Sequence, residues 1–196
     1  MKVYFLKKDI SQYVIYPVPD DESLYFVLDV ESDDELAQKT PVLHQGQGKL
    51  VLVEKQPTKD HEWNGKSWVI PKEKQTALLI KRKNNLMQII ANKTDNFKSQ
   101  YLAGYSQAEI DSFYRQEREA RNELPLMLLT EIFEGRDDLK SVDELKKKVI
   151  EKADLFAIIM GKLFAIKQGF ETHIEKAQTM EELDKIEEDI NKWQKI

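Results

Sequence analysis

The most constraining feature of this 196-residue chain is an apolar repeat that runs without a slip from residue 142 to residue 177. Side chains spaced alternately three and four residues apart lie on one face of a helix, and a strict 3.5-residue period is typical of a coiled-coil or bundle seam. Two members are polar, Lys152 and His173. We interpret His173 as a partly buried packing residue rather than a ligand or switch. The repeat comprises Val142, Leu145, Val149, Lys152, Phe156, Ile159, Leu163, Ile166, Phe170, His173 and Ala177.

Capping signals predict where this helix and its neighbours begin. A serine or threonine followed three residues later by glutamate can form a capping box, and the chain has this pattern at Ser106, Ser141 and Thr179. An earlier helical stripe follows Pro71 and ends by Gly104. The last helix is expected to fold back antiparallel on its predecessor. Gly169 lies off the long seam and weakens the helix by about 1 kcal/mol relative to alanine, so a break near this residue is an alternative.

The first 70 residues have a different period. Runs rich in aromatic and β-branched residues predict strands at 3–6, 13–17, 24–30 and 49–53. A short helix should start at Ser32 and end near residue 41, and the pair Asn64-Gly65 favours a two-residue hairpin turn.

In that hairpin, Trp63 would face Lys66, and Trp68 would be the diagonal neighbour of Trp63. The predicted fold class is therefore α+β, with a β-rich domain over residues 1–70 and a helical domain over residues 71–196.

The residues that carry chemistry do not assemble into a recognisable motif. The chain has no cysteine, which excludes disulfides, thiolate nucleophiles and cysteine-ligated metals, and its three histidines have no partner at metal-ligand spacing. Gly65-Lys66-Ser67 lacks the glycine that a phosphate loop needs five residues earlier, because that position is Asp60. We therefore expect neither an enzyme nor a cofactor, although catalytic residues can converge from distant parts of a chain.

The charge and hydropathy of the chain limit the classes of partner that it is expected to bind. The formal net charge of −5 gives no general attraction to nucleic acid, although residues 72–101 are rich in lysine. Because no aromatic stacking platform accompanies these lysines, a solvated face or a dock for an acidic surface is the preferred interpretation, and a nucleic-acid binder acting through residues 72–83 is an alternative. No apolar run is long enough to span a membrane, and the start of the chain lacks the pattern of a secretion signal.

Three stretches in a fixed order resemble the tail fibre assembly proteins of phages and prophages. The segment 57–69 is similar to that family's Trp-Asp-Gly-x-x-Trp hairpin, which precedes a long helix. The segment 105–121 is similar to its Tyr-Pro-x-x-Glu and Glu-Ala-x-Ala stretch, with Ser106 in place of the proline. The closing parts, 149–161 and 168–182, are similar to its helix and Thr-x-Glu-Glu-Leu hairpin.

The resemblance implies a chaperone that binds the phage tail fibre protein and helps it to trimerise. Such a protein would act in the host cytoplasm, with retention on the virion tail as an alternative location. A structural tail component or a coiled-coil homo-oligomer is the alternative function. The aromatic and arginine residues of the matching stretches would contact the partner, as anchors and rim respectively: Trp63, Trp68, Tyr105, Phe113, Tyr114, Arg118 and Arg121. The competing interpretation is that both tryptophans pin the hairpin to the helices and that Phe113 belongs to the core.

Overall fold

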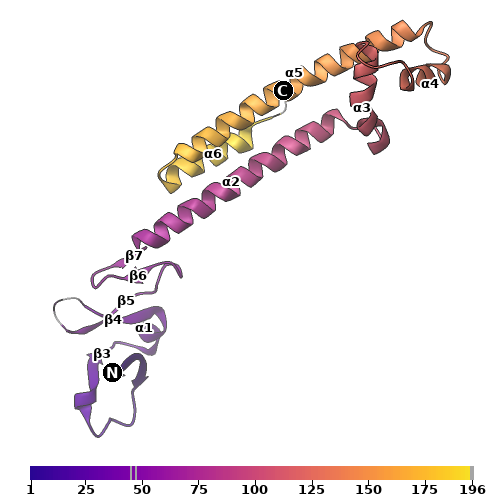
Figure 1. Ribbon diagram of the computed structural model, residues 1–196. Coiled ribbons are helices and arrows are strands. Elements are labelled where there is room, and N and C mark those ends of the chain that lie inside the picture. The colour runs from indigo at the N-terminus through magenta and orange to yellow at the C-terminus, as the bar shows by residue number, and fades with distance from the viewer. Residues whose placement is uncertain (45, 47, 195–196) are drawn as a thin grey trace. The chain divides into compact units, whose positions relative to one another are not determined.

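A computed structural model describes residues 1–44, 46 and 48–194, and it confirms the α+β class (Figure 1). The chain divides into two compact units, Met1–Leu78 and Leu79–Ile196. The division lies within helix α2 (Lys72–Tyr101) rather than at residue 70. The strands belong to the first unit, and helices α3 to α6 belong to the second.

The first unit is built from three small antiparallel sheets. Strands β2 (Asp9–Val14), β1 (Lys2–Leu6) and β3 (Tyr25–Asp29) form one sheet in that order. Strands β4 (Lys39–Leu43) and β5 (Leu50–Glu54) form the second, and β6 (Glu62–Trp63) and β7 (Trp68–Val69) form the third. A 3₁₀ turn, η1 (Glu22–Leu24), precedes β3, and helix α1 (Asp33–Gln38) precedes β4.

Alternation along the central strand builds the core of this unit. Val3 and Phe5 point to the same face of β1 and are 0% and 1% exposed. They pack with Val30 and Leu50, and partly buried side chains of β3 and α1 close the cluster. Tyr4, on the other face of β1, is also buried at 4% exposure, so a strand flanked on both sides and buried on both faces organises the sheet.

One strand prediction and one helix boundary in this unit were wrong. The strand expected at 13–17 runs instead over Asp9–Val14. The residues near Pro41, expected to end a helix, form strand β4, which pairs with β5 from Lys39 to Leu43. Proline is compatible with β4 because a two-stranded sheet leaves one side of each strand outside the ladder.

The Asn64-Gly65 turn is longer than predicted. Trp63 pairs directly with Trp68, not with Lys66, so four residues connect the strands. The side-chain oxygen of Asn64 accepts hydrogen bonds from the backbone N–H groups of Lys66 and Ser67, both at 2.9 Å. Asparagine thus organises the loop through its side chain, which a two-residue turn does not require.

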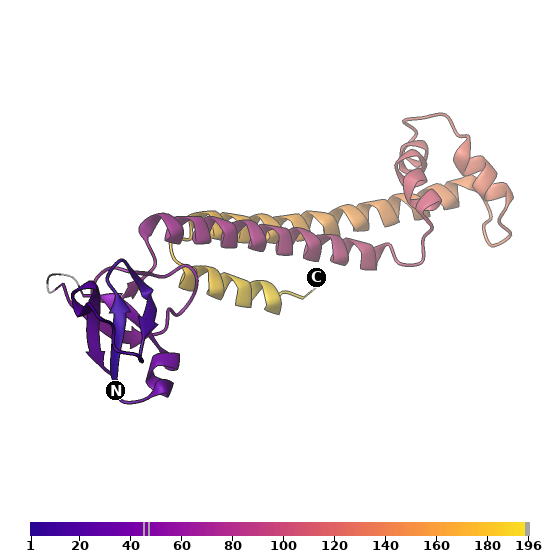
Figure 2. The same ribbon diagram turned by 90° about the horizontal axis from the view of Figure 1, so that it is seen from below.

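The second unit consists of long helices joined by short turns. It contains α3 (Gln107–Ala120), α4 (Leu128–Glu134), α5 (Val142–Lys176) and α6 (Met180–Lys192) together with most of α2. The predicted serine and threonine caps are all present, and those of α3 and α6 form complete capping boxes. Figure 2 shows α5 beside α2, with α6 folded back next to them.

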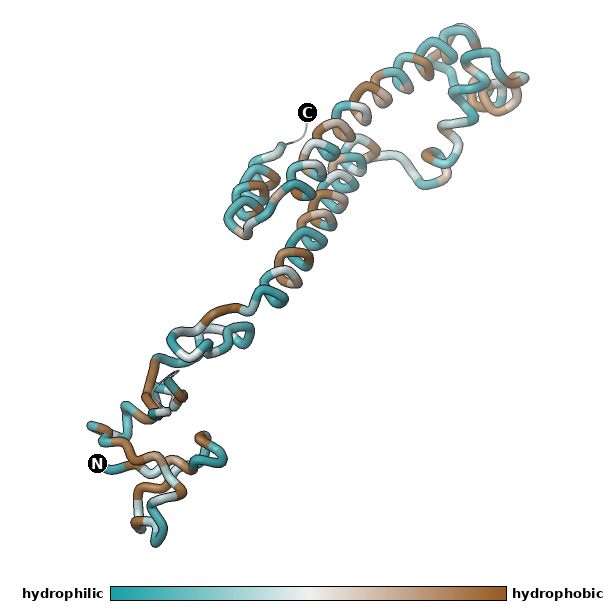
Figure 3. Tube along the Cα trace, turned by 60° about the vertical axis from the view of Figure 1, so that its left-hand side comes forward, coloured by the Kyte–Doolittle hydropathy of each residue, from teal (hydrophilic) through white to brown (hydrophobic). Residues whose placement is uncertain are grey.

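Three apolar clusters hold the helices together, and α5 contributes to each. Residues of α2, α5 and α6 form the first, including Leu86, Ile174 and Leu183, all 0% exposed. The second joins α2 to the middle of α5 through Phe97 and Leu163. The third joins α3 and α4 to the first turns of α5. Figure 3 shows hydrophobic segments, in brown, recurring along the helices.

The predicted seam of α5 is mostly correct, but its two polar members, Lys152 and His173, are exposed. The helix continues through Gly169 to Lys176, so no break occurs there. His173 is exposed, and Ile174 occupies the buried position instead, so the prediction of a partly buried histidine was wrong. An α-helix has 3.6 residues per turn, and a strict 3.5-residue pattern therefore rotates off the buried face over several turns.

Lysine and arginine residues of α2 tie α6 in place. The Lys93 ammonium donates to the backbone oxygens of Ile190 (2.5 Å) and Asn191 (3.3 Å) at the end of α6. It also lies 5.8 Å from the centre of the Trp193 ring, and burial lowers its pKa. Near the start of α6, Arg82 forms ion pairs with Asp184 and Glu187. Cations of α2 thus bind α6 at two places along its length, and Lys93, at its C-terminal end, faces the negative pole of the helix dipole.

The buried stripe of α2 makes a stability prediction. Ile90→Ala should lower the free energy of unfolding by about 2–5 kcal/mol, because it removes a fully buried side chain from the α2–α5–α6 cluster. Ile80 lies ten residues earlier on the same helix and is 53% exposed, so Ile80→Ala is the matched control and should cost about 0.5 kcal/mol or less. Urea unfolding followed by circular dichroism measures both, and equal effects would contradict the assigned packing.

Candidate partner-binding surface

The two tryptophans of the hairpin contact each other and a neighbouring sheet. Their rings meet edge to face with centroids 5.6 Å apart. The indole N–H of Trp63 donates to the backbone oxygen of Leu43 at 3.0 Å. The indole N–H of Trp68 donates to the backbone oxygen of Glu54 at 2.8 Å. Both side chains are half-buried, and these hydrogen bonds pin the β6–β7 hairpin to the strands β4 and β5.

A shallow depression lies beside Trp63. It has a volume of 500 Å³ and is lined by Ile10, Pro41, Val42, Leu43, His44, Trp63, Asn64 and Gly65. Apolar side chains dominate the lining. Trp63 therefore borders an open apolar hollow, the kind of surface that a partner side chain can enter.

Tyr105, in the turn before α3, contacts Phe113 of α3, and it also contacts Lys152 of α5. Their rings meet at 90° with centroids 5.0 Å apart. The Lys152 ammonium lies 3.3 Å from the Tyr105 hydroxyl and 5.8 Å from the ring centre. Tyr105 is 38% exposed and Phe113 is half-buried. This placement also explains Lys152, a polar member of the long repeat that lies at the surface and contacts the turn before α3.

The most exposed predicted anchor is Tyr114, with 70% of its surface accessible. The Arg118 guanidinium lies 5.6 Å from the centre of its ring, and Arg118 also pairs with Glu123 at 3.2 Å. Met127, at the start of α4, is 62% exposed. Its sulfur accepts a hydrogen bond from the Arg115 guanidinium at 3.6 Å. Tyr114, Arg115, Arg118 and Met127 form what we call the α3–α4 surface. Tyrosine, arginine and methionine are the residue types that protein interfaces favour.

Glu119 supports this surface from beneath. Its carboxylate is 0% exposed and accepts hydrogen bonds from the backbone N–H groups of Met127 (3.1 Å), Leu128 (3.2 Å) and Leu129 (3.0 Å). Arg115 adds a fourth at 2.8 Å. Burial alone would raise the pKa of Glu119, but these hydrogen bonds outweigh it and lower the pKa below its ordinary value. A buried carboxylate thus anchors the start of α4 to α3.

The remaining predicted rim residue, Arg121, forms ion pairs with residues of the second unit. It forms ion pairs with Glu117 on its own helix and with Asp154 on α5. The two pairs tie the end of α3 to α5, next to the fully buried Ala120 of the same stretch. Arg121 therefore helps to hold α3 against α5, whereas the half-buried Arg118 pairs with Glu123 and lies over the ring of Tyr114.

Sequence reasoning missed a group of exposed apolar residues in the first unit. Tyr16 is 87% exposed and Val18 is 53% exposed, in the connection between β2 and β3. Tyr13, Leu24 and Val27 on the flanking elements are also exposed. Two prolines and a run of acids around these residues predict a turn, and the apolar side chains between them are the signal that could have identified a surface.

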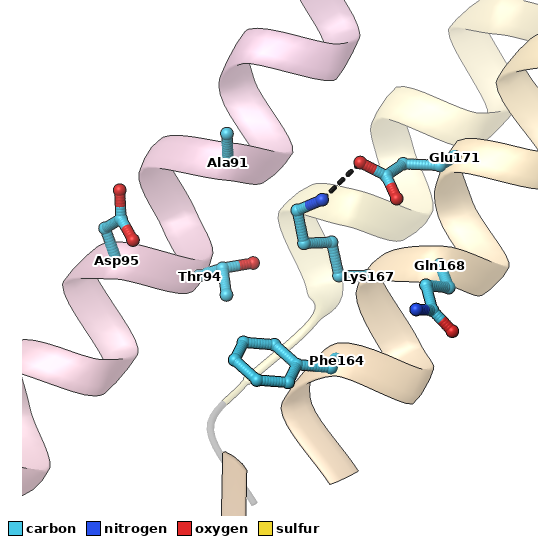
Figure 4. Close-up of a pocket in the computed structure, with 7 residues that line it drawn as sticks. All are labelled: Ala91, Thr94, Asp95, Phe164, Lys167, Gln168 and Glu171. Atoms are coloured by element: carbon cyan, nitrogen blue, oxygen red, sulfur yellow. Dashed lines mark hydrogen bonds and ion pairs between the residues drawn. The ribbon is translucent and has the colours of Figure 1, made fainter. Parts of the chain in front are cut away.

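A groove between α2 and α5 has a volume of 220 Å³ (Figure 4). Phe164 lies at its edge, Lys167 and Glu171 pair with each other, and the Thr94 hydroxyl donates to a backbone oxygen of its own helix. These polar groups are therefore satisfied internally. The groove is lined by Ala91, Thr94, Asp95, Phe164, Lys167, Gln168 and Glu171.

Metal-binding clusters and membrane-spanning helices are both absent from the described residues. Within them, no group of three or more histidine, cysteine, aspartate or glutamate side chains could hold a metal ion. None of the helices in the same part of the chain is long and apolar enough to cross a membrane. Several cations of α2 are engaged inside the protein: Lys74 with Glu62, Arg82 with α6, and Lys83 with the backbone oxygen of Glu175.

Comparison with known proteins links part of the chain to a phage. It is 45% identical over 85 residues to a protein of Haemophilus phage HP1 (strain HP1c1) named "Uncharacterized 23.3 kDa protein in lys 3'region". The aligned stretch covers 42% of this chain and 42% of the relative, less than half of either protein. No family model and no solved structure matches the chain. Over the aligned stretch the chain is therefore homologous to a phage-encoded protein.

Glu119 makes a pH-dependent prediction. Its pKa is lower in the folded state than in the unfolded state, so its stabilisation is fully present above the unfolded value, about 4.3, and is lost as the pH falls through the folded value. Glu119→Gln should cost about 3 kcal/mol at neutral pH, because three buried N–H groups lose a charged acceptor.

The measurement is thermal unfolding of the wild type and the variant between neutral pH and pH 3. The loss caused by Glu119→Gln should shrink toward acid pH, where the wild-type carboxyl group becomes protonated. Glu188→Gln is the control, because Glu188 has 71% of its side chain exposed. A Glu119→Gln loss that is independent of pH would contradict the assigned role of the carboxylate.

Proposed function

We propose that this protein is a phage or prophage assembly factor that binds the tail fibre protein and assists its folding and trimerisation. The observation that carries the proposal is the α3–α4 surface. Tyr114 and Met127 project there with more than half of their surface exposed, and arginines lie beside both. Exposed tyrosine and methionine side chains beside arginines are the residue types that protein interfaces favour.

The homologue supports the phage part of the proposal. Its name assigns it to a Haemophilus phage and states no activity, so the fibre partner comes from the resemblance of the three stretches alone. The 105–121 stretch of that resemblance contains both Tyr114 and the buried Glu119. The same stretch therefore supplies an exposed anchor and the carboxylate that holds the neighbouring helix.

A binding role suits the physical problem of fibre assembly. Trimeric fibres rich in β-structure expose apolar strand edges while they fold, and such edges aggregate unless another protein covers them. A rigid helical surface with an aromatic anchor can cover such a segment without any chemical step. On this proposal the protein acts in the host cytoplasm, without a cofactor and without contacting nucleic acid or membrane.

A structural tail component is the second candidate. The observation that favours it is the continuous 35-residue helix α5, which suits a permanent part of a particle. The two candidates differ in the finished virion. Immunoblotting of purified particles should detect a structural component in fixed proportion to the tail, whereas an assembly chaperone should be absent.

Co-expression with the tail fibre protein of the same phage or prophage tests the first candidate. The fibre should co-purify with the wild type, and soluble trimer should require it. Tyr114→Ala should reduce co-purified fibre by about tenfold, the effect of losing an interface anchor, with the circular dichroism spectrum unchanged. Fibre that trimerises equally well alone, with nothing co-purifying, would exclude the chaperone function.

Tyr16→Ala is the matched control for this experiment, because Tyr16 is an even more exposed tyrosine in the first unit. It should leave co-purification unchanged. If Tyr16→Ala abolishes fibre binding while Tyr114→Ala does not, the contact lies in the first unit and the assignment to the α3–α4 surface is wrong.

A further inference from the structure

Helix α5 carries a second repeat on its solvent side. Starting at Glu151, residues alternate four and three positions apart as far as Lys176, and every member is exposed. We call this set the outer seam. It comprises Glu151, Leu155, Ile158, Lys162, Ala165, Gly169, Thr172 and Lys176. A 3.5-residue period is the pattern by which one helix pairs with another in a coiled coil.

The outer seam contains side chains that the protein itself does not use. Leu155 is 59% exposed and Ile158 is 57% exposed, although both lie in the middle of the longest helix. Gly169 weakens that helix, yet a methyl group added there would meet no atom within 4 Å. Packing within the chain therefore requires neither the large residues nor the glycine. Phe164 lies on a different flank of α5, at the groove facing α2, and is not part of this seam (Figure 4).

The seam is complementary to itself when two copies run antiparallel. In the register that places Ile158 opposite Gly169, Lys162 lies opposite Ala165 and Leu155 lies opposite Thr172. Leu155, Ile158 and Lys162 thereby each meet a smaller residue, which allows close approach of the two helices in the middle of the seam. A two-fold axis relates the halves of such an interface, so each contact occurs twice.

Charge selects the same arrangement. At each end of this register Glu151 lies opposite Lys176, an acid against a base. A parallel pair in register would instead place Glu151 against Glu151, Lys162 against Lys162 and Lys176 against Lys176. Like charges at facing positions oppose association, and opposite charges set partner choice and orientation.

We propose that the outer seam of α5 binds a second copy of this chain, forming an antiparallel homodimer. The buried seam on the other side of α5 holds α2 and α6, so one helix serves both the fold and the dimer. The proposal does not depend on the tail fibre function, because its evidence lies in the outer seam alone.

Mass measurement gives the first test. Size-exclusion chromatography with light scattering should show the full-length protein at twice its 23.0 kDa chain mass. Ile158→Glu should weaken the dimer by about tenfold or more, because two apolar contacts per dimer are lost. Ile80→Glu, at an exposed isoleucine of α2, is the control and should leave the dimer intact. A monomer at every concentration up to about 100 μM, corresponding to at best weak association, would overturn the proposal.

Cysteine cross-linking tests the orientation, since the natural chain has no cysteine. A mixture of the Ile158→Cys and Gly169→Cys proteins should form a mixed disulfide dimer on oxidation. Neither variant should cross-link alone, because each position is offset from its own copy by about 16 Å along the helix. Self-cross-linking of Ile158→Cys would indicate a parallel pair. Absence of the mixed product would exclude the register that places Ile158 opposite Gly169. Lys192→Cys on α6 is the unreactive control.

A charge swap tests the ends of the seam. Glu151→Lys and Lys176→Glu should each weaken the dimer at low salt, and the two changes combined in one chain should restore it. The far-UV circular dichroism spectrum should be unchanged in all three, because both positions are exposed. Failure of the double variant to regain the dimer would contradict the pairing of Glu151 with Lys176.

Discussion

The helical unit depends on the burial of one face of α5. Each of its three apolar clusters contains residues of this helix, from Leu145 near its start to Ile174 near its end. Helices α2, α3, α4 and α6 are thus assembled around one element, and the shorter of them would be marginal alone in water. Substitutions at the fully buried positions of α5 should therefore affect several contacts at once, whereas changes on its solvent side should not affect the fold.

The stretch from Tyr105 to Arg121 combines structural and exposed residues at close sequence spacing. Glu119 and Arg121 satisfy partners on α4 and α5, while Tyr114 is exposed and the half-buried Arg118 lies over its ring. A sequence pattern that includes all four residues therefore reflects two requirements, the packing of α3 against α4 and α5 and the presence of an exposed aromatic side chain. Holding the backbone rigid under an aromatic side chain reduces the entropy that binding would otherwise lose. This arrangement is physically coherent with a surface prepared for a protein partner.

Sequence patterns predicted the features that depend on local chemistry. The caps at Ser106, Ser141 and Thr179 follow from side-chain hydrogen bonds within one turn, and the long seam follows from helical periodicity. Features set by tertiary structure were not predictable in this way. The burial of Glu119 depends on a helix that begins nine residues later, and Pro41 lies in a strand because β5 pairs with its neighbours. The hairpin loop was mispredicted because the Asn64 side chain replaces a tighter backbone turn.

The distribution of the three tryptophans gives each compact unit its own optical reporter. Trp63 and Trp68 lie together in the first unit, whereas Trp193 packs against Phe97 and Phe170 in the second. Emission from Trp193 alone, in a chain whose other two tryptophans are replaced by phenylalanine, would report the helical cluster. The aromatic rings that hold each unit together can therefore also show whether the two units unfold in one transition or in two.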